Sequence, residues 1–349
     1  MDLEEFKKKL DPVLQKTLNK KIKSLTLHKN EDIKIYLQHL KKFMEEGKRI
    51  RPYLSYLTFK SAGGKNDKDA IELFVFIEIF HAFCLIHDDI MDKADYRHSI
   101  KTIHKFISDS ELNNKYTSAR HYGNSQAILI GDFMLTWALN HLINNKKFDE
   151  RSIKRVLDIF FQMADEVVFG QMIDISLTKE KNTTDEKVLQ KITLKTADYS
   201  FVKPMLIGAT LAKEVKNKKF FEDFGKHLGI AFQTQDDLLD IKFDSKQTHK
   251  SSFSDVAGHQ HTFFTNYIFR NGTKNQIETL NKFFGKRIGT KDYQKLRKVF
   301  ADSGAMDYGE KIIKENFQTA KDILIKEKMD RKIKMCFEKL IEKIERRSS

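Results

Sequence analysis

Apolar residues recur at spacings of three and four positions along much of this chain. One stretch carries Ile153, Val156, Leu157, Phe160 and Phe161, and another runs through residues 313–324. This spacing places the apolar side chains on one face of an α-helix. Proline occurs only at positions 12, 52 and 204, so the segment between the last two contains no residue that must break a helix. The pattern predicts an all-α protein built from long helices.

Residues typical of turns gather between these stretches, at positions 61–67, 144–150, 178–186 and 244–255. None of these segments is long enough or biased enough to be an interdomain linker. The best Asn-Gly pair, at positions 271–272, lacks two flanking strands, and no repeat of about 20 to 50 residues is evident. We therefore expect residues 1–349 to form a single domain.

The most apolar segment, Ala70–Ile86, approaches the length that crosses a membrane. It contains Glu72, Glu78 and His81, whose transfer into lipid is costly, so we expect a buried core helix and no transmembrane segment. The N-terminus does not show the basic and apolar pattern of a signal peptide. Cysteine occurs only at positions 84 and 336, so we expect no disulfide framework. We expect a cytoplasmic protein.

The formal net charge is +14, which suits nucleic acid, an anionic membrane surface or a phosphorylated small substrate. Lys and Arg are spread along the chain among Glu and Asp, which is typical of solvated helix faces. A nucleic-acid-binding helical protein would rest on the net charge alone, because no helix-turn-helix or zinc motif supports it. We expect no nucleic acid partner, and peripheral contact with a membrane stays open.

Two acidic clusters share the pattern Asp-Asp-x-x-Asp, and each ends an apolar, helix-like stretch. The first cluster comprises Asp88, Asp89 and Asp92, and the second comprises Asp236, Asp237 and Asp240. On a helix the first and third carboxylates share a face and the middle one lies a step round, so all three can point into one cavity. Like charges at this spacing repel, and a helix C-terminus adds to the cost. Each cluster therefore needs a cation.

Hard divalent cations meet this need, because Mg²⁺ takes oxygen ligands and typically uses one or two carboxylates with substrate phosphate oxygens. Two facing clusters could hold a diphosphate through bridging ions. An acidic surface turn is the alternative for a single cluster, and the second copy favours a metal site. The segment "GKRIRP" adds Lys48 and Arg51, which are suited to direct contact with phosphate.

In its motifs the chain resembles the trans-isoprenyl diphosphate synthases, also called polyprenyl synthetases. The matching segments run in consistent order from about residue 47 to residue 262: "GKRIRP", "HAFCLIHDDIMD", "RHSIKTIH", "AILIGD", "GQMID", "KTADYSFVKP", "GIAFQTQDDLLD" and "HKSSFSDVAGHQHT". The resemblance implies an all-α isoprenoid synthase-type bundle of long antiparallel helices around a central catalytic cavity. It implies a prenyltransferase that condenses an allylic diphosphate with isopentenyl diphosphate by 1'-4 head-to-tail elongation, and a homodimer.

The resemblance also assigns roles to individual residues. Three Mg²⁺ ions would be held by Asp88, Asp89, Asp92, Asp236, Asp237 and Asp240. The allylic diphosphate would be gripped by Arg97, Lys195 and Lys250, with Gln171 and Asp174 lining the same cavity. Isopentenyl diphosphate would be bound by Lys48, Arg51 and His81, and the reacting carbons would face Thr196 and Gln233.

The chain departs from the family pattern at two cationic positions. His98 stands where the family has a second Arg in the substrate-binding set, and Gln260 stands where it has a Lys. Neutral His does not reproduce the charged fork of Arg. These changes motivate an alternative, a non-catalytic or weakly active family member that serves as a regulatory or binding subunit. The two intact aspartate clusters argue for catalysis.

Product length is weakly encoded in the family by the residues four and five positions before the first Asp. These are Cys84 and Phe83 here, and the large Phe83 suggests a floor under a short tail. The prediction is a farnesyl or geranylgeranyl diphosphate synthase. A longer-chain polyprenyl diphosphate synthase is the alternative.

Overall fold

The protein is described here by a computed structural model of residues 1–25, 30–97, 99–111, 118–213, 217–242 and 253–346. The first half contains the helices α1 (Leu3–Leu25), α2 (Glu31–Glu45), α3 (Ile50–Ser61), α4 (Asp67–Met91), α5 (Ile103–Ser110), α6 (Ala119–Ile143) and α7 (Glu150–Leu177). The second half contains α8 (Asp185–Ile192), the π-helix η2 (Thr193–Val202), α9 (Lys203–Leu211), α10 (Lys218–Lys242), α12 (Ser254–Ala257), α13 (Phe263–Asn271), α14 (Lys274–Phe283), the 3-10 helix η3 (Thr290–Asp292), α15 (Tyr293–Asp302), α16 (Ala305–Lys326) and α17 (Arg331–Glu345). The all-α prediction is confirmed.

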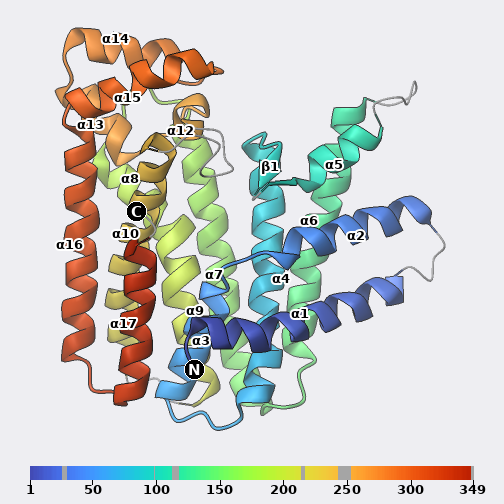
Figure 1. The fold of residues 1–349 in the computed structure, drawn as a ribbon. Helices are drawn as coiled ribbons and strands as arrows, with labels where there is room; N and C mark the ends of the chain where they lie inside the picture. The colour runs from blue at the N-terminus through green and yellow to red at the C-terminus, as the bar shows by residue number, and fades with distance from the viewer. Residues whose placement is uncertain (26–29, 98, 112–117, 214–216, 243–252, 347–349) are drawn as a thin grey trace.

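The long helices α4, α6, α7, α10 and α16 stand together as a bundle, with α1 and α2 lying across one side of it (Figure 1). Helices α13, α14 and α15 gather at one end of the bundle, beside the upper part of α16 (Figure 1). Helix α4 packs on α6, and η2 packs on both α7 and α10. The segment η2 therefore lies between α7 and α10.

One short hairpin interrupts the helical pattern directly after α4. Its strands, β1 (Tyr96–Arg97) and β2 (Ile100–Lys101), are antiparallel, with Tyr96 opposite Lys101. The Thr102 hydroxyl donates to the Ala94 carbonyl at 2.7 Å and ties the base of the hairpin. Two residues per strand are too few to show the alternation that marks strands in a sequence. For that reason the pattern did not predict this hairpin.

Helix α4 is the apolar segment that resembled a membrane span. Asn66 caps its first turn by accepting from the Asp69 amide, which satisfies one of the free donors at a helix start. In the described part of the chain, α4 is the one helix that is both long enough and apolar enough to cross a membrane. Of its most apolar window, 72% is buried inside the protein. The buried core helix predicted from the sequence is confirmed.

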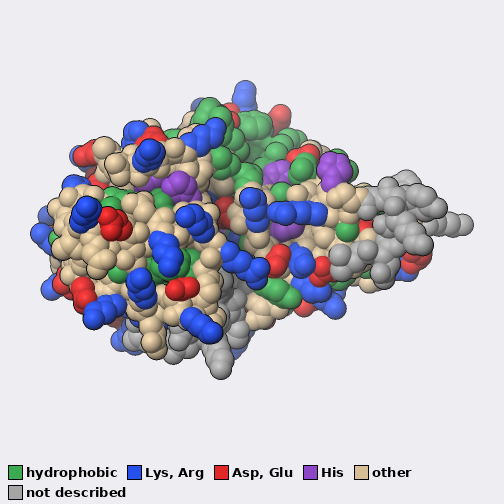
Figure 2. Space-filling model, turned by 90° about the horizontal axis from the view of Figure 1, so that it is seen from above, with side chains coloured by type: hydrophobic (Ala, Val, Ile, Leu, Met, Phe, Trp, Pro, Cys, Tyr) green, Lys and Arg blue, Asp and Glu red, His purple; other side chains and the backbone are tan. Residues whose placement is uncertain are grey.

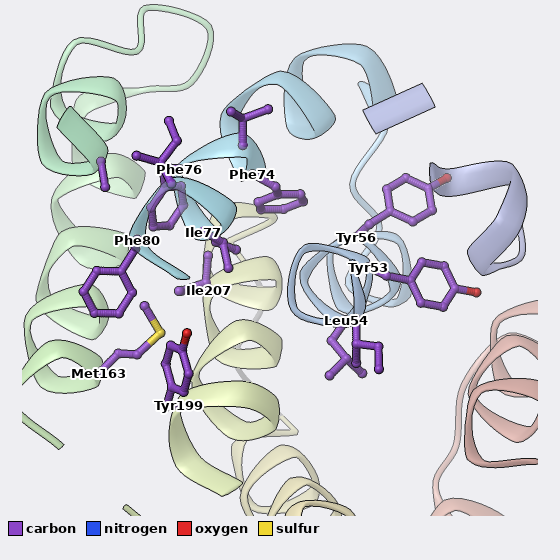
Figure 3. Packing of buried hydrophobic residues seen from close by; sticks show 14 of the residues in the cluster. Tyr53, Leu54, Tyr56, Phe74, Phe76, Ile77, Phe80, Met163, Tyr199 and Ile207 are labelled. Atoms are coloured by element: carbon purple, nitrogen blue, oxygen red, sulfur yellow. The ribbon is translucent and has the colours of Figure 1, made fainter. Parts of the chain in front are cut away.

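Aromatic side chains fill the core beside α4. Phe76 and Phe80 are fully buried, and Phe160 from α7 packs against both, with ring centroids 5.7 Å and 4.9 Å away. Figure 3 shows Phe80 near Met163 of α7 and Tyr199 of η2. These large side chains therefore join three elements, α4, α7 and η2, near the C-terminal end of α4.

Two glycines let η2 approach its neighbours closely. A side chain at Gly170 of α7 would place its Cβ 2.5 Å from the Lys195 amide nitrogen, and one at Gly229 of α10 would lie 2.4 Å from the Ala197 Cα. Both distances are far below normal carbon contacts, so only glycine fits without movement of the backbone. The close packing brings the polar face of η2 against α7 and α10.

Candidate active site

The first aspartate cluster lies at the last turn of α4, which ends at Met91 with Asp92 as its C-cap. Asp89 is 1% exposed and accepts two hydrogen bonds from the Arg97 guanidinium, at 2.9 Å from Nε and 2.6 Å from Nη2. The same Nη2 lies 3.5 Å from Asp88 Oδ2. Because negative charge at a helix C-terminus is unfavourable, Arg97 compensates the end of α4.

Lys195 links the first cluster to α7. Its Nζ lies 3.1 Å from Asp88 Oδ1 and 2.7 Å from Asp174 Oδ2. Burial disfavours the charged amine, but the carboxylates of Asp88, Asp174 and Asp92 outweigh it and raise the pKa of Lys195. Lys195 is therefore a permanent cation between two helices.

The carboxyl group of Asp92 has a raised pKa. Crowding by protein, followed by the charge of Asp88, raises its pKa to about 7, although Lys195 and Arg97 act in the other direction. The residue is exposed as a whole, so its carboxyl stays accessible from solvent. The rise follows from burial of the charged form and from the like charge of Asp88.

The second aspartate cluster lies near the end of α10. Asp237 is 7% exposed, and its Oδ1 accepts a hydrogen bond from Gln233 Nε2 at 2.8 Å. Thr196 of η2 donates its hydroxyl to Gln233 Oε1, also at 2.8 Å. Burial raises the pKa of Asp237 to about 7, and the charges of Asp236 and Asp240 add to the rise. Thr196 and Gln233, which were expected to face the reacting carbons, are thus joined to each other by a hydrogen bond.

Asp240 binds the chain that follows the second cluster. Its Oδ1 accepts from the Ser254 amide at 3.0 Å and from the Ser254 hydroxyl at 2.8 Å, and its Oδ2 accepts from the Asp255 amide at 3.0 Å. These donors belong to the first turn of α12. Asp240 thereby anchors α12 to the end of α10, a structural role that the sequence did not indicate.

Lys191 is a second cation on Asp174, and sequence reasoning missed it. Its Nζ lies 3.1 Å from Asp174 Oδ1, so the two oxygens of Asp174 each face an ammonium group, from Lys191 and from Lys195. Burial alone would raise the pKa of Asp174, but these two lysines lower it below its ordinary value. Lys191 is one lysine among many in the sequence, and only its burial distinguishes it.

The predicted isopentenyl diphosphate residues form a second basic group at the start of α3. Arg51 Nη1 lies 3.0 Å from His81 Nε2, and Arg51 Nη2 donates to the Ser200 hydroxyl at 2.8 Å. Because the guanidinium can only donate, Nε2 of His81 accepts and its Nδ1 carries the proton toward the Tyr199 hydroxyl, 2.5 Å away. Lys48 is exposed, with its Nζ 5.8 Å from the centre of the Phe232 ring.

Arg49, between Lys48 and Arg51, is a second residue that sequence reasoning missed. It is 4% exposed, adopts a left-handed backbone with φ of 55°, and pairs with Asp11 at 2.8 Å and Glu78 at 2.7 Å. It also donates to two carbonyls at the end of α2. These contacts fix the position of Arg49 in the turn before α3, and with it the positions of Lys48 and Arg51.

Three further residues predicted for the site lie on α7 and α4. Gln171 lies on α7 with its Nε2 3.6 Å from Met91 Sδ, beside the end of α4. Phe83 is 9% exposed and packs its ring on Phe80 and His87, and Cys84 is half-buried on the same helix. His98 and Lys250 lie outside the described residues.

The donor set suits Mg²⁺, although it is not assembled into a closed ligand cage. Among the described residues no three acidic, histidine or cysteine side chains converge to hold a metal by themselves. Mg²⁺ typically takes one or two carboxylates and completes its shell with water and substrate oxygens. Burial, and after it the neighbouring carboxylates, raise the pKa of Asp92 and of Asp237 to about 7, and each cluster has three carboxylates within five residues. The residues therefore fit an ion that arrives with a phosphorylated ligand.

The sequence profile of the family described as Polyprenyl synthetase matches residues 33–302. This range contains both aspartate clusters, Arg97, Lys191 and Lys195. The chain belongs to the polyprenyl synthetase family. It is a prenyltransferase of the isoprenyl diphosphate synthase type, as the relatives below show.

Curated relatives of this polyprenyl synthetase differ in product length. It is 27% identical over 281 residues to a geranylfarnesyl diphosphate synthase of Aeropyrum pernix, which covers 80% of this chain and 83% of the relative. It is 23% identical over 326 residues to an octaprenyl diphosphate synthase of Haemophilus influenzae, covering 93% and 91%. The shared chemistry is prenyl transfer, and the names do not agree on the length of the product.

A solved relative shares the whole fold of this polyprenyl synthetase. The crystal structure of a geranylgeranyl pyrophosphate synthase from Corynebacterium glutamicum, complexed with isoprenyl diphosphate and magnesium, superposes with a TM-score of 0.93 at 25% identity. The match covers 99% of each chain. The isoprenoid synthase-type bundle predicted from the sequence is confirmed.

Proposed function

We propose that the protein is a Mg²⁺-dependent short-chain prenyl elongase that condenses an allylic diphosphate with isopentenyl diphosphate to farnesyl or geranylgeranyl diphosphate. The observation that carries the proposal is Lys195, whose amine joins Asp88 of α4 to Asp174 of α7 across the site. A cation at this point, with Arg97 beside it, offers two direct contacts to a diphosphate that enters between the clusters. The solved relative described above holds magnesium and an isoprenyl diphosphate.

The reaction needs neutralisation of a leaving diphosphate while water is excluded. Mg²⁺ bound to the six clustered carboxylates, as three ions, would supply charge that weakens the allylic carbon–oxygen bond. Arg97 and Lys195 bind and orient the diphosphate oxygens in this proposal. Thr196 and Gln233, linked by their hydrogen bond, present oxygen dipoles to the allylic carbon as it becomes cationic. The buried aromatic side chains of α4 and α7 exclude water from the reacting carbons.

Isopentenyl diphosphate is assigned to the basic group at the start of α3. Arg51 is held by His81 and Ser200, and Lys48 is exposed beside it. The double bond of this substrate attacks the allylic cation, and the proton then lost passes to the departing diphosphate. The buried contacts of Arg49 keep the two cationic residues in place for binding.

A short product is proposed because aromatic rings fill the space below the first cluster. Phe83 lies five positions before Asp88, and Phe80 contacts it with ring centroids 5.5 Å apart. Phe160 lies behind Phe80. A prenyl tail gains on the order of 0.8 kcal/mol per buried CH₂, but it cannot extend past these rings unless they move.

The decisive assay incubates the protein with Mg²⁺, isopentenyl diphosphate and either dimethylallyl, geranyl or farnesyl diphosphate, and identifies the products by mass. We expect farnesyl or geranylgeranyl diphosphate as the end product. Octaprenyl diphosphate as the main product would contradict the chain-length assignment, and a folded protein that makes no product would contradict catalysis.

Replacement of Phe83 by alanine tests the floor of the tail site. We expect Phe83→Ala to add at least one isoprene unit to the main product, because the large ring no longer blocks the tail. Phe74→Ala, a fully buried ring farther from the clusters on the same helix, controls for a general loss of packing. An unchanged product with Phe83→Ala would remove Phe83 from this role.

We also propose a homodimer, a cytoplasmic location and one domain over residues 1–349. Large apolar side chains are exposed on α6 and α7, among them Leu129 at 61%, Phe169 at 57% and Met172 at 56%, and such a surface is typical of a protein interface. Lys and Arg are scattered with Asp and Glu over the face shown in Figure 2, which does not resemble a nucleic-acid site. Light scattering at micromolar concentration tests the dimer.

A further inference from the structure

The π-helix η2 contacts both proposed substrate sites. Lys195 and Thr196, near its start, lie beside the aspartate clusters. Tyr199 and Ser200, farther along the same helix, contact the basic group at the start of α3. Helices of this type are rare and often occur at functional sites. Tyr199 has no part in the mechanism proposed above, and Ser200 enters it only as a partner of Arg51.

The guanidinium of Arg51 is held by neutral groups. Its Nη1 lies 3.0 Å from His81 Nε2, its Nη2 donates to the Ser200 hydroxyl at 2.8 Å, and its central carbon lies 4.5 Å from the centre of the Tyr199 ring. None of these partners carries negative charge, whereas Arg49, two positions earlier, pairs with two carboxylates. A guanidinium that is oriented but not neutralised by these partners is suited to an external anion.

The Tyr199 hydroxyl determines which nitrogen of His81 can accept a hydrogen bond from Arg51. Neutral histidine carries one ring proton, and only the nitrogen without this proton can accept. The hydroxyl oxygen lies 2.5 Å from His81 Nδ1. When Nδ1 donates to this oxygen, the free lone pair is on Nε2, which faces Arg51. Burial raises the pKa of Tyr199 well above its ordinary value, so the hydroxyl adds no negative charge beside the guanidinium.

Tyr199 and Ser200 are themselves held firmly. Each is 4% exposed. The Tyr199 ring packs edge-on against Phe80, with ring centroids 5.9 Å apart, and Figure 3 shows it close to Met163 as well. Fixed partners of this kind restrict the rotamers of Arg51 before a ligand arrives, which reduces the conformational entropy lost on binding.

We propose that Tyr199 and Ser200 are positioning residues, which together aim Arg51 at the diphosphate group of isopentenyl diphosphate. Ser200 acts by its direct hydrogen bond, and Tyr199 acts through the tautomer of His81. Each of these contacts uses one N–H of the guanidinium, so one N–H on each Nη remains for phosphate oxygens. This inference rests on the proposed function, because it takes the basic group to be the isopentenyl diphosphate site.

The test is a calorimetric titration of the full-length protein with isopentenyl diphosphate in EDTA. Without Mg²⁺ the aspartate clusters repel a diphosphate, so the measurement reports on the basic group. Tyr199→Phe and Ser200→Ala each remove one hydroxyl and keep the rest of the side chain in place. Ser200→Thr keeps the hydroxyl and serves as the conservative variant.

Two matched controls remove a buried hydroxyl elsewhere. Tyr56→Phe, on α3, removes a hydroxyl that donates to Asp67 at 2.9 Å. Ser108→Ala, on α5, removes a hydroxyl that donates to the His104 carbonyl at 2.7 Å within its own helix. Neither control residue belongs to the proposed substrate sites.

We expect the Kd of isopentenyl diphosphate to rise about tenfold in Ser200→Ala, because a hydrogen bond from a charged group is lost. Tyr199→Phe, which loses a hydrogen bond between neutral groups, should raise it about threefold. Ser200→Thr, Tyr56→Phe and Ser108→Ala should match the wild type. In prenyl transfer, the KM of isopentenyl diphosphate should rise by similar factors, while the KM of the allylic diphosphate stays unchanged.

A double-mutant cycle with His81→Gln separates the tautomer from packing. Glutamine can place its amide oxygen near the position of Nε2, and this oxygen accepts from Arg51 without any choice of tautomer. Tyr199→Phe should therefore have a smaller effect on the Kd in the His81→Gln protein than in the wild type, by about twofold or more. An equal effect in both proteins would overturn the role of Tyr199.

Unchanged or tighter binding by Tyr199→Phe and Ser200→Ala, in a protein that elongates prenyl chains, would overturn the inference and leave the proposed function intact. An equal rise of both KM values, or a loss in Ser200→Thr as large as in Ser200→Ala, would indicate a general structural effect and overturn it too. So would failure of both hydroxyl deletions to fold, measured by melting temperature. Binding in the expected order without any prenyl product would contradict the proposed function and leave this inference standing.

Discussion

The two aspartate clusters have the same sequence pattern but different surroundings. The first, at the end of α4, is compensated by cationic side chains that come from elsewhere, Arg97 of β1 and Lys195 of η2. The second, on α10, is held mainly by hydrogen bonds, from Gln233 to Asp237 and from the start of α12 to Asp240. The pattern Asp-Asp-x-x-Asp thus specifies carboxylates at one end of a helix, whereas the neighbouring residues in space determine how each carboxylate is compensated.

This difference suggests different tasks for the clusters. Ion pairs with Arg97 and Lys195 can be exchanged for contacts with a diphosphate, because both partners can bind phosphate as well as carboxylate. The hydrogen bonds of Asp240 hold the chain itself and would have to break before that carboxylate could turn fully to a metal. We therefore expect substitutions in the first cluster to act mainly on the reaction, and substitution of Asp240 to act strongly on stability.

The largest effect is expected from Asp88→Asn. The change removes one charge that holds Lys195 and one proposed oxygen ligand for Mg²⁺, and we expect kcat to fall on the order of a thousandfold. Glu72→Gln, an exposed residue on the same helix, should leave kcat unchanged. Steady-state prenyl transfer at saturating Mg²⁺ measures both. A loss of only a few fold with Asp88→Asn would mean that the first cluster is not the centre of the reaction.

Asp240→Ala is expected to act on folding. It removes three hydrogen bonds to Ser254 and Asp255, and the loss of such a helix cap costs about 1 to 2 kcal/mol of the free energy of unfolding. Denaturation in urea without Mg²⁺ measures this cost. Asp236→Asn, in the same cluster, serves as the control and should change stability less. Equal stability of the two variants would contradict a structural role for Asp240.

The smallest effect is a dependence of stability on pH that both clusters share. The pKa values of Asp92 and Asp237 are near 7 in the folded protein and near 4 in the unfolded chain, so between these values the folded state binds more protons. The free energy of unfolding of the Mg²⁺-free protein should therefore fall as the pH rises from about 5 to about 8. Mg²⁺ should restore stability at the upper end and have little effect at the lower end.

Melting temperatures in EDTA and in Mg²⁺ across this pH range provide the measurement. Asp92→Asn removes one of the two groups and should flatten the dependence in EDTA, which separates the first cluster from the second. A Mg²⁺ effect that is equally large at both ends of the range would contradict the assignment of these protons.

Part of the site could be predicted because its residues occur in short motifs. Both clusters, Arg97, Lys195 and Arg51 were found in this way, and the structure brings Arg97 and Lys195 to the first cluster. The roles of Lys191 and Arg49 could not be predicted, because each looks like one of many surface cations until its burial is known. The hairpin after α4 was missed for a related reason, since two residues per strand carry no periodic signal.

The helical architecture and the two carboxylate clusters follow from the order of the amino acids, because apolar spacing and charge repulsion act over a few neighbouring residues. Which carboxylates are compensated, and by which cations, depends on the packing of distant helices. Lys195 reaches Asp88 and Asp174 because Gly170 and Gly229 let η2 lie close to α7 and α10. Electrostatic energies depend on distance and burial between residues that are far apart in the chain, and these quantities exist only once the helices have packed.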